Sequence, residues 1–174
     1  MKKKLGLLLV VFMVLITVVG CGKKENENNE KEDVLLEDEV ILENIKYKLD
    51  QDDEGYGIKY KIANNFRRQD LVNAINYFSE NINDSPYFVI RIYHYTDKNL
   101  EESIKWSVDE YDKREDVKVG DRNFTKVHFV NYNNAETNLY FYEKAPKEHY
   151  VFVFTSSIDL SRLEDIFLKS VDFD

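Results

Sequence analysis

Short segments in which apolar and polar residues alternate recur through residues 41–174, and they constrain the fold more than any other feature. Tyr56 to Ile62 alternate most cleanly, with aromatic and aliphatic side chains on one face and mainly lysines on the other. Because successive side chains of a strand point to opposite faces, this pattern predicts a strand with one packed face. The acidic segment Asp50 to Gly55 before it is predicted to be a hairpin turn. Further strands are predicted at 41–49, 87–96, 123–132, 138–144, 150–156 and 171–173, and residues 73–79 fit either a strand or a helix.

Two segments have helical rather than alternating periodicity. In residues 99–112 the apolar side chains recur every three or four positions, and Asn99 with Glu102 fits a capping box at the N-terminus. Ser161 with Glu164 fits a second capping box at the start of another helix. The expected apolar stripes are Leu100, Ile104, Val108 and Tyr111 in the first helix, and Leu163, Ile166, Phe167 and Ser170 in the second.

The order of these elements predicts an α+β fold. Hairpins dominate, so the sheet is expected to be mostly antiparallel and flanked by the two helices. Residues 56–66, the pair 139–143 and 150–154, and residues 166–173 resemble the opening strand, central hairpin and closing helix of PsbP-like domains. The resemblance implies a PsbP-like α/β/α sandwich over residues 41–174. It also implies a binding or assembly module without a shared active site.

The N-terminal segment is typical of an export signal. Three lysines precede an apolar run over residues 5–19, which is shorter than the roughly 20 residues that span a membrane. Val18 to Cys21 then resembles the lipobox of bacterial lipoproteins. The resemblance implies removal of residues 1–20, lipid attached to Cys21, and a location on the extracytoplasmic face of the cell membrane. Residues 21–40 are rich in acidic residues and predict a flexible linker.

Composition excludes several classes of partner. The formal net charge of −9 would become −12 on loss of Lys2, Lys3 and Lys4 with the signal peptide. A chain this acidic is not expected to bind nucleic acid. Cys21 is the one cysteine, so the folded region can form no disulfide. The abundance of Lys, Asn, Ile and Tyr resembles the usage of low-GC Gram-positive bacteria.

The sequence offers no familiar catalytic or cofactor motif, so no catalytic residue, metal ligand or cofactor is predicted. Phosphate-binding loops need clustered glycines, and the chain has only six glycines in all. His94, His128 and His149 fall on separate predicted strands, with no spacing that predicts a zinc site. The segment Asp50 to Gly55 resembles the start of a calcium loop, but Lys61 stands where the bidentate Glu is needed.

Three aromatic residues are candidates for binding a partner. Trp106 lies about 200° around its predicted helix from Ile104, so it either covers a sheet edge or projects as an exposed anchor. Tyr93 and Tyr95 fall on the strand face opposite Ile90 and Ile92, where they either pack under a helix or form an exposed surface for protein or glycan.

These features favour a membrane-anchored binding or assembly module that recognises an envelope protein or glycan. Two alternatives remain open at the level of sequence. One is a cell-envelope hydrolase with an atypical site, and the other is a lipoprotein that binds a small ligand or calcium.

Overall fold

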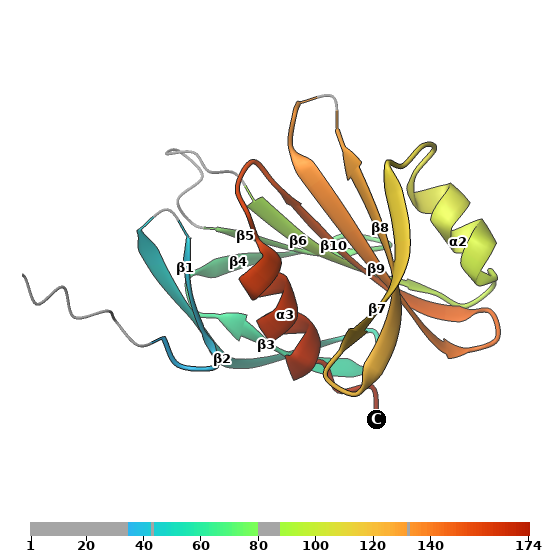
Figure 1. Cartoon of the computed structure of the whole chain (residues 1–174). Coiled ribbons are helices and arrows are strands. Elements are labelled where there is room, and N and C mark those ends of the chain that lie inside the picture. Colours follow the sequence, from blue (N-terminus) through green and yellow to red (C-terminus); the bar gives the residue numbers. More distant parts are fainter. Residues whose placement is uncertain (1–34, 43, 80–87, 132) are drawn as a thin grey trace, which may run out of the picture. The chain divides into compact units, whose positions relative to one another are not determined.

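The computed structural model describes residues 35–42, 44–79, 88–131 and 133–174, which form two antiparallel sheets and two helices (Figure 1). The predicted signal peptide, Cys21 and most of the linker lie outside these residues. The helices are α2 (Leu100–Ser107) and α3 (Ser161–Ser170). The three-stranded small sheet contains β1 (Glu39–Leu42), β2 (Ile45–Gly55) and β3 (Ile58–Ala63) in that order. The seven-stranded large sheet has the order β4 (Phe66–Asp70), β5 (Ile75–Ser79), β6 (Phe88–Tyr95), β10 (Glu148–Ser156), β9 (Glu136–Ala145), β8 (Arg122–Val130) and β7 (Lys113–Val119).

The hairpin between β2 and β3 turns through Tyr56 and Gly57, which both have positive φ values, 54° and 77°. Two consecutive residues with positive φ suit the right-handed twist of the strands that they join. The hydroxyl of Tyr150 donates a hydrogen bond to the carbonyl oxygen of Tyr56 at 2.9 Å. This long-range contact links the small sheet to the centre of the large one.

The central strands of the large sheet are apolar on both faces, so they take part in two separate cores. Along β10, Tyr150, Phe152 and Phe154 belong to the larger core, whereas Val151 belongs to the smaller core on the opposite face. The larger core is closed by the small sheet and α3, which lie together on one side of the large sheet in Figure 1. The smaller core is covered by α2 on the other side, through the buried Ile104.

The edge strands of the large sheet were not predicted. The strands β4 and β7 are rich in charged residues and are mostly exposed. Charged side chains on an edge strand oppose pairing with a second sheet. They also break the alternation by which the other strands were recognised, although Val117 and Val119 of β7 still pack against the larger core.

The prediction of a PsbP-like α/β/α sandwich is wrong. The mostly antiparallel sheet and the two helices are present, but the fold is β-rich. One face of the large sheet is covered mainly by the small sheet together with α3, and the other face carries α2, which has only eight residues. The physical reason is that the hairpin of β2 and β3 pairs with β1 as a second layer instead of extending the large sheet.

Several predicted elements also differ in extent. The segment Asp50 to Gly55 is the second half of β2 and not a turn. The predicted helix over 99–112 ends at Ser107, so Tyr111 lies outside it. The predicted final strand is a single bridge between Lys59 and Asp172. At the N-terminal end, β1 includes Glu39 and Val40, which lie at the end of the predicted linker.

The capping-box prediction holds for one helix. The Asn99 side chain accepts a hydrogen bond from the Glu102 amide, and the Glu102 carboxylate accepts one from the Asn99 amide. At α3 the N-cap is Leu160, and no side-chain cap is formed. Glu164 is only 2% exposed, so its side chain points into the protein instead of capping the helix.

Candidate ligand-binding groove beside helix α2

Helix α2 rests on the large sheet through a narrow face and leaves part of that sheet open. Ile104 and Ser103 are buried against the strands, whereas Trp106 is 74% exposed. Leu100 and Val108 flank Ile104 on the smaller core. The helix therefore fixes the backbone of Trp106 while most of its indole is exposed to solvent, and its role as an anchor for a partner stays a prediction.

A cavity of about 390 Å³ opens between the last turn of α2 and strands β6, β8, β9 and β10. We call it the aromatic groove. Its volume falls within the range of small-ligand sites. Tyr93 and Tyr95 from β6 and Trp106 from α2 all line it, so the structure brings together the three residues predicted to bind a partner. Phe129, Leu139 and Val153 complete its apolar surface.

Aromatic rings and cations form a row along the groove. The rings of Tyr93 and Tyr95 are nearly parallel, with centroids 6.0 Å apart. The Arg91 guanidinium carbon lies 5.9 Å from the centroid of the Tyr93 ring. At the other end, the Lys98 ammonium lies 5.4 Å from the Tyr95 centroid and 4.9 Å from that of Trp106. Cation–π attraction at such distances stabilises this arrangement of rings and cations.

The polar part of the groove consists of small groups that both donate and accept hydrogen bonds. Thr137 and Thr155 face each other from neighbouring strands, with hydroxyl oxygens 3.2 Å apart. Ser107 and Asn131 contribute a further hydroxyl and an amide. No carboxylate lines the groove among the described residues. The nearby Asp97 is held ionised, because a hydrogen bond from Lys98 lowers the pKa of its carboxyl group.

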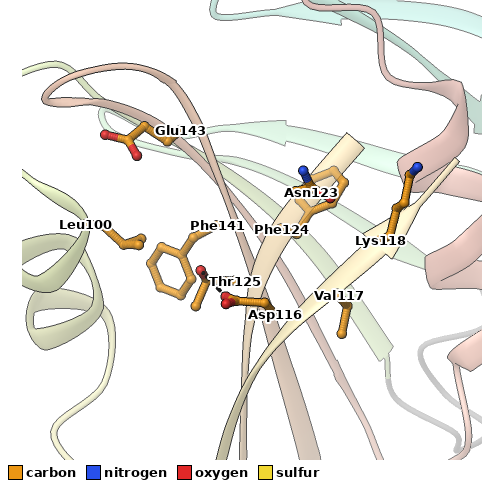
Figure 2. Close-up of a pocket in the computed structure, with 9 residues that line it drawn as sticks. All are labelled: Leu100, Asp116, Val117, Lys118, Asn123, Phe124, Thr125, Phe141 and Glu143. Atoms are coloured by element: carbon orange, nitrogen blue, oxygen red, sulfur yellow. Dashed lines mark hydrogen bonds between the residues drawn. The ribbon is translucent and has the colours of Figure 1, made fainter. Parts of the chain in front are cut away.

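A second cavity, of about 520 Å³, lies at the opposite end of α2 against β7, β8 and β9 (Figure 2). It contains two carboxylates, those of Asp116 and Glu143. Figure 2 shows Asp116 accepting a hydrogen bond from Thr125, with Glu143 lying apart from this pair. The Glu143 side chain is 53% exposed. A catalytic carboxyl pair needs one desolvated member, so this cavity gives no support to the hydrolase hypothesis.

The three histidines do not converge. His94 and His128 lie on the face of the larger core, whereas His149 lies on the opposite face, since it shares the parity of Val151. His94 stacks on Tyr150 with centroids 4.4 Å apart, as a half-buried side chain. His149 is fully buried, and neither ring nitrogen has a hydrogen-bond partner among the described residues. Within the part of the chain that the structure describes, no group of three potential metal ligands is found.

The acidic segment Asp50 to Gly55 is extended, so its side chains alternate between two faces instead of converging on a cation. Asp50 pairs with Lys48, and Asp53 pairs with Arg68 and accepts a hydrogen bond from Tyr77 at 2.8 Å. These carboxylates therefore have partners within the protein.

The sequence interpretation missed Arg91. This residue has the same parity as Tyr93 and Tyr95 on β6, so strand alternation alone would have placed it on their face. Thr137 and Thr155 carry no comparable signal, since they come from strands whose pairing depends on the whole fold.

Comparisons with known proteins do not assign a family. No protein-family model matches the chain, and no curated protein matches it. A crystal structure from Bacteroides thetaiotaomicron superposes with a TM-score of 0.47 and 12% identity. The match covers 67% of this chain and 44% of that chain. Among the described helices, none has the length and hydrophobicity that crossing a membrane requires.

Proposed function

We propose that this chain is a lipid-anchored extracytoplasmic binding protein that recognises a cell-envelope component through the aromatic groove. The observation that carries this proposal is the convergence of Tyr93, Tyr95 and Trp106 on one cavity. Tyr, Trp and Arg are the residues most enriched at binding hot spots. The rigid rings of Tyr and Trp lose little conformational entropy when a ligand binds.

Exposure of the indole supports the same function. A side chain of this size is seldom left in solvent, and Trp106 is 74% exposed at the rim of a preformed cavity. The open end of the groove lies on the face of the large sheet that carries α2, where no other described element covers the sheet. A bound ligand would bury the apolar surface that is now in water, which favours binding.

The lipid anchor is the second part of the proposal, and it rests on the lipobox at Val18 to Cys21. We expect the wild-type protein to fractionate with membranes and Cys21→Ser to be released in soluble form. Release of neither protein, or of both equally, would contradict attachment through this cysteine.

Capture by isolated cell walls of the parent bacterium tests the binding function. We expect Trp106→Ala to weaken sedimentation with walls about tenfold or more, which matches the loss expected for a hot-spot Trp. Val72→Ala is the matched control, because Val72 is 96% exposed but lies in the turn after β4 and outside the groove. Equal capture of wild type and Trp106→Ala would remove the groove from the proposed function.

A further inference from the structure

The groove is positively charged within an acidic protein. The chain has 33 acidic and 24 basic residues, yet the charged side chain that lines the groove is Arg91. Its Nε donates to the side-chain oxygen of Asn76 at 2.7 Å, and its Nη1 donates to the hydroxyl of Tyr93 at 3.0 Å. Asn76 is only 2% exposed, so a buried amide orients the guanidinium.

Arg91 differs from the arginines that are ion-paired within the fold. Arg68 pairs with Asp53 and Asp70, and Arg114 pairs with Glu101. Among the described residues no carboxylate pairs with Arg91, and its Nη2 group has no hydrogen-bond partner. A half-buried guanidinium that is oriented, and that no described carboxylate neutralises, suits a carboxylate supplied by a ligand.

The remainder of the groove suits a sugar ring better than a peptide. The electron-rich faces of the Tyr93 and Tyr95 rings attract the polarised C–H groups of a pyranose ring. The hydroxyls of Thr137, Thr155 and Ser107 can both donate and accept, as sugar hydroxyls do. Extended peptides commonly bind at a free strand edge, whereas β6 and β10 are interior strands whose edges are already paired.

We propose that the aromatic groove binds an acidic glycan, with the carboxylate of a sugar residue on Arg91 and the sugar ring against Tyr93 and Tyr95. This proposal rests on the proposed function of the groove and adds the chemistry of its ligand. Lys98, between Tyr95 and Trp106, already pairs with Asp97, so Arg91 is the cation assigned to the ligand.

Trp106 supplies the assay, because it is the one tryptophan in the chain and lies in the groove. The full-length protein in detergent micelles would be titrated with trigalacturonic acid while tryptophan emission is recorded. We expect a saturable change in emission. The fully methyl-esterified trisaccharide, which has the same rings without charge, should bind about tenfold more weakly or worse, because a hydrogen bond to a charged group is lost.

Arg91→Gln should bring the affinity for the acid down to that for the ester, whereas Arg67→Gln on β4 should leave both affinities unchanged. Equal binding of acid and ester by the wild type would overturn the carboxylate assignment, and this readout does not depend on how any variant folds. Equal or tighter binding of triglutamate would overturn the assignment to a sugar. If none of the probes changes the emission, the acidic-glycan assignment fails, while binding to cell walls still decides the proposed function.

Discussion

At the scale of single residues, Glu164 shows how the interior accommodates a charge. Its carboxylate accepts hydrogen bonds from the Asn138 amide at 2.7 Å and from the Tyr140 hydroxyl at 2.5 Å. Lys126 lies 3.7 Å away and is partly solvated. Burial and the adjacent carboxylate raise the pKa of Tyr140, so the phenol remains a donor under ordinary conditions. The Asn138 amide and the Tyr140 hydroxyl therefore both rely on Glu164 for a hydrogen-bond acceptor.

Removal of this carboxylate should therefore destabilise the fold. We expect Glu164→Ala to lower the free energy of unfolding by about 2–3 kcal/mol, because the buried amide and hydroxyl lose their acceptor. Asp165→Ala is the control on the same helix. Its side chain is 48% exposed and pairs with Lys169 on the surface, so its loss should cost less than about 0.5 kcal/mol. Urea unfolding measures both variants, and similar losses would contradict the assigned network.

Residue patterns predicted the structure where the signal was local, and failed where the partner was distant. The alternation that ends at Ile62 was sufficient for β3, since burial follows parity there. The acids of Asp50 to Gly55 were assigned to a turn because such clusters usually remain in solvent. They lie in a strand because residues 51–55 pair with β3, and Arg68 and Tyr77 from two other strands satisfy Asp53. No pattern within residues 50–55 predicts the contacts of Asp53 with Arg68 and Tyr77.

At the scale of elements, α2 is the element on which the groove depends. It has eight residues and buries Ser103 and Ile104 on the sheet. A helix of this length is marginal by itself, so its first turn relies on the cap. The reciprocal hydrogen bonds of Asn99 and Glu102 satisfy two amides that would otherwise lack partners.

The N-termini of helices α2 and α3 have similar sequences but different caps, so they should respond differently to mutation. We expect Asn99→Ala to cost about 1 kcal/mol and to speed hydrogen exchange in α2, because the capping box is lost. Ser161→Ala should change stability by less than about 0.5 kcal/mol, since the Ser161 side chain makes no cap. Hydrogen exchange with unfolding titrations tests both, and a larger effect at Ser161 would contradict the described caps.

Elements also limit how much of the groove could be predicted. Trp106, Tyr93 and Tyr95 were candidates because helix and strand periodicity place them away from the apolar faces. Their convergence could not be predicted, since it requires α2 to lie on the face of β6 that also carries Arg91. Helix placement is set by the smaller core around Ile104 and Val127, which four separate elements build.

At the scale of the whole molecule, buried tyrosines connect the layers. The hydroxyls of Tyr60 in the small sheet and Tyr77 in the large sheet are 2.8 Å apart. Tyr77 also donates to Asp53. Burial raises the pKa of Tyr60 to about 12, and burial with these hydrogen bonds raises that of Tyr77 as well. Ionisation of either phenol would place a charge between the sheets.

This arrangement predicts that stability is lost at alkaline pH. A phenol whose pKa is raised in the folded state contributes its full stabilisation at pH values below 10.0, which is its pKa in the unfolded chain. That stability falls as the pH rises from 10 toward 12, by about 1.4 kcal/mol per pH unit for each such group. Urea unfolding at pH 8–11 measures the slope, which Tyr60→Phe should reduce. A flat profile to pH 11 would contradict the burial of these phenols.

We propose that the molecule binds its ligand in the groove beside α2. The side-chain indole N–H of Trp106 gives a single resonance in a proton–nitrogen correlation spectrum, since the chain has one tryptophan. On titration of the labelled full-length protein with soluble cell-wall fragments, we expect this resonance to shift and saturate while the amide of Val72 stays in place. An unchanged indole resonance, with shifts confined to other regions of the protein, would contradict the claim.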